Sequence, residues 1–422
     1  MAKSILDFWK NAAALITDTS GLLDTRALLD TKKISDTSDV LNTDKIFNDE
    51  NDEAENEETN LNLTVEEVKA WKLKKSIDKT KILITSFQNK IIIAKSKSDA
   101  SNIVIESAQE LFTTAVNMIN EDWNWRDNYL YWTRLIFRCI LKKSKNKVVK
   151  SSIEELIILV EEYSRGRATV ELDPNIKNIL ISGFELFDVS QGNELTQANQ
   201  SGILALSLHN KVITLADGEA KIQSVIWSNR YEDFNNNLIE NFYAEYFNKV
   251  DLIITFSLDA NDNTTINIER FAANYRGGFK DNNNIGVKEN KTVKSDNPFY
   301  ESTLPYIPMV KKNLSFKVFN TFLREGYSGI SKEGKELGDY YLDVHNTNPE
   351  SLIIDLTNLE LDIMKTGGGG NYFSNEIFFR VASLRDKINP NFPYGHIHVP
   401  NVQKVDYEDY ISLITKIIKD AF

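Results

Sequence analysis

Four stretches in the C-terminal half of the chain contain side-chain types from which catalytic sites are built. Residues 181–187, ISGFELF, are typical of a strand that ends in a glycine turn and carries two phenylalanines three positions apart. Residues 266–274, INIERFAAN, contain a Glu-Arg pair. Residues 369–375, GGNYFSN, and 394–400, YGHIHVP, contain a serine and two histidines. Carboxylate, imidazole and hydroxyl groups serve acid–base and nucleophilic catalysis, and histidine pairs also bind metal ions.

Each of these residues also has a purely structural interpretation. Ser374 precedes an amphipathic segment and would be a good helix N-cap. Glu269 and Arg270 could simply pair with each other at a sheet edge. His396 and His398 alternate on a strand and therefore share one face, which makes a metal pair conceivable. No third ligand has an obvious spacing, however, so we expect no metal site.

The segments that hold these residues predict an α/β fold. From about Ile176, aliphatic stretches such as NILISGF, SVIWS and DLIITFSL alternate with helical segments. Near-continuous aliphatic strands of this kind form parallel or mixed sheets covered on both faces, so we predict a three-layer α/β/α sandwich over residues 176–422. Functional residues in such folds usually lie at strand carboxyl ends and helix N-termini. The glycine run at 367–370 lacks the Gly-Lys-Ser/Thr ending of a phosphate loop, and we expect no cofactor.

Taken together and in this order, the stretches resemble the pyroglutamyl-peptidase family over residues 176–422. That family has a Gly-Phe-x-Pro-Phe turn and an Ile-x-x-Glu-Arg-x-Ala-x-Asn segment. It also has an Ala-Gly-Thr-Tyr/Phe-Val-Cys-Asn segment and a Gly-Phe-Ile-His-Val/Ile-Pro strand end. The resemblance implies a catalytic triad in which Glu269 is the acid, His398 is the general base and Ser374 stands at the nucleophile position.

The resemblance also implies a substrate pocket. Phe184 and Phe187 match the phenylalanines that hold the pyroglutamyl ring in the family. Asn193 matches an asparagine of the family's first loop by its offset from them. A peptide with an N-terminal pyroglutamyl group is therefore the ligand that the resemblance implies.

The nucleophile position departs from the family, because Ser374 stands where the family keeps a cysteine. A cysteine at a helix N-terminus beside a histidine ionises readily, with a pKa of about 3.5–7.5, whereas a serine hydroxyl stays neutral. Leu186 replaces the proline of the first turn. The loop at 259–264 lacks the family's glycine pair and arginine, the stretch at 276–281 is altered, and an insertion at 306–366 could cap or fill the pocket.

These departures together favour a pyroglutamyl-peptidase-like domain that is catalytically impaired and acts as a structural or binding component of an assembly. The alternative is an active hydrolase that removes N-terminal pyroglutamate or a related group with Ser374, His398 and Glu269. A third interpretation is that the serine is an engineered inactivation of a cysteine enzyme.

The N-terminal part of the chain is predicted to contain three segments. Residues 1–47 carry a six-residue repeat (DTSGLL, DTRALL, DTKKIS, DTSDVL, NTDKIF). An even period keeps equivalent side chains on one side of a strand, so we predict an extended arm for a protein partner or self-assembly, with a tethered tail as the alternative. Residues 48–60 form an acidic linker. Residues 61–170 are predicted to be mainly helical, with a capping box at Thr64 and Glu67 and a hairpin at 81–94.

Composition narrows the function classes further. The net charge of −12 disfavours nucleic-acid binding, which needs clustered basic residues. No run of about 18 apolar residues is present, so we predict no membrane span. Cys139 is the single cysteine, which fits a reducing compartment, and we predict a cytoplasmic protein. Because Cys139 lies in an apolar helical stretch, we expect it to be a buried packing residue.

Overall fold

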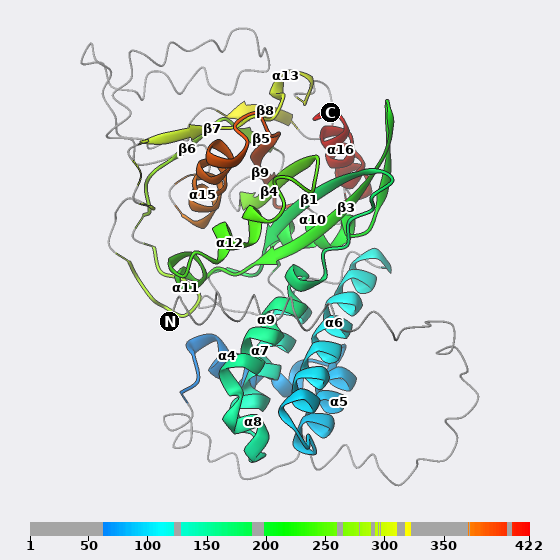
Figure 1. Cartoon of the computed structure of the whole chain (residues 1–422), viewed down its shortest axis with the longest axis vertical. Helices are drawn as coiled ribbons and strands as arrows, with labels where there is room; N and C mark the ends of the chain where they lie inside the picture. The colour runs from blue at the N-terminus through cyan, green and yellow to red at the C-terminus, as the bar shows by residue number, and fades with distance from the viewer. Residues whose placement is uncertain are drawn as a thin grey trace. The chain divides into compact units, whose positions relative to one another are not determined.

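A computed structural model of the chain, shown in Figure 1, describes residues 62–121, 128–187, 198–259, 265–277, 279–287, 292–293, 295, 297–309, 317–321, 370, 372–402 and 407–422. The chain divides into two compact units, residues 1–54 and 55–422, and every described residue belongs to the second. The predicted arm at 1–47 and the predicted acidic linker at 48–60 lie outside the described residues.

The first part of the described chain is mainly helical, as predicted (Figure 1). Its elements are α4 Val65–Leu73, η3 Lys74–Ser76, α5 Lys81–Ile92, α6 Lys97–Glu121, α7 Asn128–Lys143, α8 Lys147–Ser151, α9 Ile153–Ser164 and η4 Arg167–Thr169. The predicted capping box starts α4. The Glu67 N–H donates to Thr64 Oγ1 at 3.3 Å, and the Thr64 N–H donates to Glu67 Oε2 at 2.7 Å. None of the described helices is long and apolar enough to cross a membrane.

The hairpin predicted at residues 81–94 is wrong, because this segment forms helix α5. Ile84, Phe87 and Ile91 follow one another at intervals of three and four residues, and all three are fully buried. This spacing places them on one face of a helix. Phe87 stacks on Phe137 of α7 with ring centroids 4.2 Å apart. Burial of this face outweighs the β propensity of an isoleucine-rich segment, which depends strongly on context.

A mixed sheet forms the centre of the remaining chain. In the described residues, seven strands pair in the order β2-β3-β1-β4-β9-β5-β8. Strands β3, β1, β4 and β9 are parallel, whereas β2 is antiparallel to β3 and β5 is antiparallel to β9. In sheet order the strands are Val212–Leu215, Gly218–Trp227, Lys177–Phe184, Leu252–Asp259, Tyr394–Pro400, Thr265–Glu269 and Lys317–Thr321.

Helices cover both faces of this sheet, which confirms the predicted three-layer fold. One apolar cluster contains Ile179 and Ile181 of β1 together with residues of α10 (Gln200–Leu208) and α16 (Tyr407–Lys419). The other contains Leu180 of β1 together with residues of α11 (Tyr231–Asn235), α12 (Leu238–Ala244) and α15 (Phe373–Ile388). Successive residues of β1 therefore face opposite layers, and this explains why its sequence is apolar throughout.

The helical region shares its core with the α/β layers. Leu111 of α6 and Phe137 of α7 belong to the same apolar cluster as Ile179 and Ile181 of β1. Helix α6 also packs against α10. The helices thus form part of one folded unit with the sheet.

Gly183 shows how closely the end of β1 approaches α10. A Cβ at this position would lie 2.1 Å from the backbone oxygen of Ser201. Only glycine permits such an approach of two backbones. The N–H of Phe184 donates to the Ser201 hydroxyl at 3.1 Å, which fixes the start of the turn that follows β1.

Part of the predicted insertion at 306–366 extends the sheet. It begins with α13 (Tyr306–Met309), and its strand β8 pairs with β5 in parallel. A separate antiparallel pair, β6 (Phe271–Ala273) and β7 (Phe299–Glu301), precedes it. The suggestion that the insertion caps the pocket stays a prediction.

Candidate active site

Glu269 and His398 meet on two neighbouring strands. Glu269 is the last residue of β5, and His398 lies in β9, which runs antiparallel to β5 with Asn267 opposite His398. Nδ1 of His398 lies 2.7 Å from Oε1 of Glu269, and both side chains are buried. Because a carboxylate accepts hydrogen bonds, Nδ1 carries the proton in this contact and Nε2 carries the lone pair of the neutral ring. An imidazole held in this tautomer can act as a base through Nε2.

Arg270 does not pair with Glu269, contrary to the structural interpretation of the Glu-Arg pair. The Arg270 Nε donates to Glu301 Oε1 at 2.5 Å, and its guanidinium lies over the ring of Tyr306 at 4.1 Å. Neighbouring residues of a strand point to opposite faces. The carboxylate of Glu269 is therefore directed to His398 rather than to the adjacent arginine.

His396 has a different environment from His398, although the two ring centroids are only 5.0 Å apart. The Thr255 hydroxyl lies 2.8 Å from His396 Nδ1, and the Ser257 hydroxyl lies 2.7 Å from its Nε2. Both ring nitrogens thus contact hydroxyl groups of β4. Among the described residues, no group of three His, Cys, Asp or Glu side chains is placed to hold a metal ion.

Ser374 lies in the first turn of α15 and is half-buried. The N-cap of this helix is Tyr372, so the interpretation of Ser374 as the N-cap is wrong. The next residue, Asn375, anchors the helix start: its Oδ1 accepts from the Ala273 N–H at 2.8 Å, and its Nδ2 donates to the carbonyls of Ala273 and Tyr275. Because Ala273 follows Glu269 by four residues, these bonds hold the serine-bearing turn against the chain that leaves β5.

A buried ion cluster also holds the first turn of α15. Arg276 Nε donates to Glu376 Oε2 at 2.5 Å, and a second nitrogen of Arg276 contacts Glu376 Oε1. Arg380 Nε donates to the same carboxylate at 2.8 Å. Sequence reasoning missed this cluster, although the four-residue spacing of Glu376 and Arg380 is a signal for a helical ion pair. Arg276 starts the altered stretch at 276–281, which therefore supports α15.

The two phenylalanines implied to form the pocket differ in burial. Phe184 ends β1 and is buried in the same apolar cluster as Phe373, the residue before Ser374. Phe187 is half-buried. Asn193 lies outside the described residues. The structure therefore brings Phe184 and the start of α15 into one cluster.

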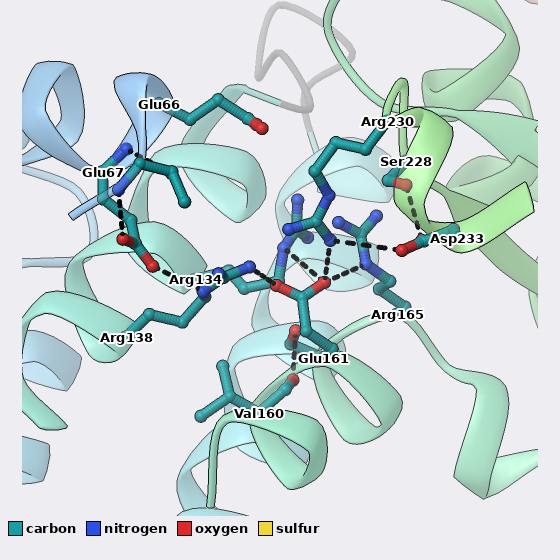
Figure 2. Close-up of polar contacts among 12 residues, drawn as sticks. Glu66, Glu67, Arg134, Arg138, Val160, Glu161, Arg165, Ser228, Arg230 and Asp233 are labelled. Atoms are coloured by element: carbon teal, nitrogen blue, oxygen red, sulfur yellow. Dashed lines mark hydrogen bonds and ion pairs between the residues drawn. The ribbon is translucent and has the colours of Figure 1, made fainter. Parts of the chain in front are cut away.

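A network of buried charges lies between the helices and the sheet (Figure 2). At its centre, Glu161 of α9 accepts from Arg138 at 2.6 Å and from Arg165 and Arg230 at 2.7 Å each. Glu185, the residue between Phe184 and Leu186, pairs with Arg134 and with Arg165. Burial alone would raise the pKa of Glu161, but the surrounding arginines hold it well below its usual range.

Sequence analysis did not identify this network. The available signal was Arg134 and Arg138, which lie four residues apart inside the apolar segment of α7. Two arginines on one face of a buried helix require carboxylate partners, since arginine is almost never fully buried unless paired. The partners are Glu67 of α4, Glu161 of α9 and Glu185 after β1, and their identity follows only from the tertiary fold.

Cys139 is buried, as expected, and its thiol donates to the carbonyl oxygen of Glu67 at 3.3 Å. Burial raises the pKa of this thiol above its usual range. A cysteine that resists ionisation is a poor nucleophile. Cys139 is therefore a poor candidate for a catalytic nucleophile.

Comparisons with known proteins match part of this chain to a protein family. The family model described as PA0049, C-terminal domain, matches residues 178–327 and 343–403, which together make up half of the chain. Uncharacterized protein PA0049 of Pseudomonas aeruginosa is 23% identical over 354 residues, and the match covers 65% of this chain. The chain spans 63% of the length of that relative.

Solved structures with similarity to this chain include two peptidases. A mutant pyrrolidone carboxyl peptidase from the hyperthermophile Pyrococcus furiosus is 19% identical, with a TM-score of 0.39, and the match covers 58% of this chain and 97% of that chain. Pyroglutamyl peptidase I from Bacillus amyloliquefaciens is 18% identical, with a TM-score of 0.38, over 58% of this chain and 92% of that chain.

Proposed function

This chain belongs to the PA0049 family through its C-terminal domain, and we propose that this domain is a pyroglutamyl-peptidase-like hydrolase in which Glu269 and His398 activate Ser374. The buried 2.7 Å contact between Glu269 Oε1 and His398 Nδ1 carries the proposal. Burying a carboxylate costs free energy, and one hydrogen bond from a neutral imidazole adds only a modest net stabilisation. The contact between Glu269 and His398 is therefore better explained by proton transfer than by a contribution to folding.

The proposed reaction follows from the orientation of the imidazole. Nε2 of His398 takes the proton of the Ser374 hydroxyl while the serine oxygen attacks the carbonyl carbon of the substrate. The imidazolium, stabilised by Glu269, then gives this proton to the leaving amine, and water hydrolyses the acyl-enzyme by the same route. The first turn of a helix favours the negative charge that develops at the attacked carbonyl, which suits the location of Ser374 in α15.

The substrate class is supported by the sequence resemblance at residues 181–187. An N-terminal pyroglutamyl group, or a related lactam, presents a flat ring with apolar edges. Aromatic side chains such as Phe187 and Phe184 bind rings of this kind by packing against them. The peptide beyond the scissile bond is not specified by any described residue.

The decisive measurement is release of a fluorogenic amine from a pyroglutamyl amide by the purified full chain. We expect slow turnover that disappears in Ser374→Ala. We also expect Ser374→Cys to turn over faster, because a thiol at a helix N-terminus beside histidine ionises readily. If the unmodified protein and Ser374→Cys are both inactive toward pyroglutamyl and other acyl amides, the proposal is wrong.

The second candidate is the impaired, structural or binding component favoured by the sequence. Two observations support it: a serine hydroxyl stays neutral where the family uses a thiol, and Phe184 is only 2% exposed. In this case a pyroglutamyl peptide would bind, as measured by calorimetry, without being cleaved. The proposed arm at 1–47 would supply the partner contact or self-assembly, and its deletion would reduce oligomer size. The single cysteine supports a cytoplasmic location for either candidate.

A further inference from the structure

We propose that Arg134 and Arg165 are positioning residues for the candidate active site, because they hold Glu185 and thereby fix the turn that carries Phe184 and Phe187. This inference rests on the proposed function. It assigns the helical region a role in shaping the site.

Glu185 is the direct link between the helices and the turn. It follows Phe184 at the end of β1 and is 2% exposed. Its Oε2 contacts a terminal nitrogen of Arg134, in α7, and lies 2.7 Å from Nη1 of Arg165, the residue that ends α9. Both arginine side chains are fully enclosed. Bonds between buried groups of opposite charge are short and strongly directional, so the side chain of Glu185 has one defined position.

The backbone of the same turn is held from the sheet side. The Glu185 N–H donates to the Trp227 carbonyl at 2.9 Å, which continues the β1–β3 ladder by one residue. Side-chain amides of Asn199 and Asn229 donate to the Glu185 carbonyl at 2.8 and 2.7 Å. The Leu186 carbonyl accepts from Asn229 at 2.9 Å and from a further asparagine, Asn282, at 2.7 Å. The α/β layers therefore hold the backbone of the turn, and the helices hold the side chain of Glu185.

The arginines that hold Glu185 also connect the turn to the neighbouring strand end. Arg165 Nε donates to Glu161 at 2.7 Å, and Arg230, which follows β3, donates to the same carboxylate oxygen (Figure 2). Since β1 and β3 are adjacent and parallel, the network joins the carboxyl ends of both strands to α9. These strand ends are where an α/β sheet positions its ligands. The placement of the network thus matches a role in the site.

A purely structural role for the network predicts a different result from a positioning role. Glu162, one residue after Glu161, is also buried and pairs with Arg167 at 2.8 Å without touching Glu185. Glu162→Gln therefore breaks an ion pair in the same interface and serves as the matched control for Glu185→Gln. Both changes keep the side-chain size, and both are expected to lower the melting temperature.

The test compares these variants of the full chain by hydrogen exchange and by kinetics with the pyroglutamyl amide. We expect Glu185→Gln to speed hydrogen exchange of the backbone amide at position 185 about tenfold, because one charged hydrogen-bonded contact is lost. For the same reason we expect KM for the pyroglutamyl amide to rise about tenfold, with little change in kcat. Glu162→Gln should leave both quantities within about twofold. Arg134→Lys, which keeps the charge but not the planar fork, should lie between wild type and Glu185→Gln.

The inference and the proposed function fail in different ways. If Glu185→Gln and Glu162→Gln change exchange at residues 184–187 equally, the positioning role is overturned, whatever the activity. If wild type and Ser374→Cys both lack turnover but exchange separates Glu185→Gln from Glu162→Gln, the proposed reaction is wrong while the role of the arginines in holding the turn stands. Should Glu185→Gln not fold, Arg134→Lys provides the same comparison against Glu162→Gln.

Discussion

Two groups of buried ionisable side chains in this protein differ in whether they can change charge. Around Glu161, the side chains of Arg134, Arg138, Arg165 and Arg230 supply permanent positive charges to carboxylates. At Glu269, one carboxylate meets one imidazole. An arginine keeps its charge at any physiological pH, whereas an imidazole exchanges its proton near neutrality. Burial of charge therefore does not by itself indicate a catalytic site, and what sets the Glu269–His398 pair apart is an imidazole that exchanges its proton near neutrality.

The contrast between the two groups of buried side chains is tested most directly at Glu269. We expect Glu269→Gln to lower kcat by about 10⁴-fold, because glutamine cannot stabilise the imidazolium and favours the wrong tautomer of His398. Folding should be nearly unaffected, since the two side chains have the same shape. Steady-state kinetics and thermal unfolding of the same preparation measure both effects. A variant that keeps a tenth or more of the activity would show that Glu269 does not assist His398 as the acid of the triad.

Loss of a charge in the network around Glu161 should lower the stability of the protein rather than its activity. We expect Glu161→Gln to reduce the free energy of unfolding by about 3–5 kcal/mol, because it leaves several buried arginines without a counter-charge. Urea denaturation of the full chain measures this loss. The residual activity of the folded fraction should be much closer to wild type than that of Glu269→Gln.

Helix α9 provides its own control for this prediction. Glu155 pairs with Lys97 at 2.5 Å, but the two side chains are 47% and 58% exposed. Glu155→Gln should cost less than about 1 kcal/mol, as exposed ion pairs do. If Glu155→Gln and Glu161→Gln destabilise the protein equally, the network is not the source of stability that its burial indicates.

Glu66 is an exception within the network, because it can change charge. Burial raises the pKa of this carboxyl to about 7, against the attraction of Arg230, while Glu185 raises it further. The Tyr131 hydroxyl donates to its Oε2 at 2.6 Å. The folded pKa lies above the unfolded value near 4.5. The stabilising contribution of Glu66 is therefore complete below pH 4.5 and is lost as pH rises through 7.

The raised pKa of Glu66 predicts that wild type and Glu66→Gln differ in how their stability depends on pH. The free energy of unfolding of wild type, relative to the variant, should fall by about 3 kcal/mol between pH 4.5 and 7.5 and then level off. Urea denaturation at a series of pH values in one buffer system gives this difference directly. A flat difference across that range would show that folding does not raise the pKa of Glu66.

The sequence predicted those parts of the fold that depend on local pattern. The aliphatic stretches at β1 and β4, the amphipathic helices, and the capping box at Thr64 all follow from periodicity or from a short motif. The segment of α5 was mistaken for a hairpin because its isoleucines favour strands. Its helical structure depends on packing of its apolar face against α7, which the segment's own sequence does not show.

The candidate site was predictable for a different reason. Glu269 and His398 lie 129 residues apart, and no spacing rule joins them, but the ordered motifs implied that they meet. No motif joined Arg134 to Glu185, which are 51 residues apart and belong to different parts of the fold. Such contacts depend on how helices dock on a sheet, and residue types alone do not determine docking.

A small effect is expected at His396, which lies on the same strand two residues before His398. The Ser257 hydroxyl lies 2.7 Å from His396 Nε2, whereas His398 faces a carboxylate. We expect Ser257→Ala to cost about 1 kcal/mol of stability, the usual value for one hydrogen bond, and to leave kcat within about twofold. Thermal unfolding and turnover of the pyroglutamyl amide measure the two effects. A loss of kcat comparable to that of Glu269→Gln would place His396 in the proton-transfer path, and the contrast between the two histidines would then have to be abandoned.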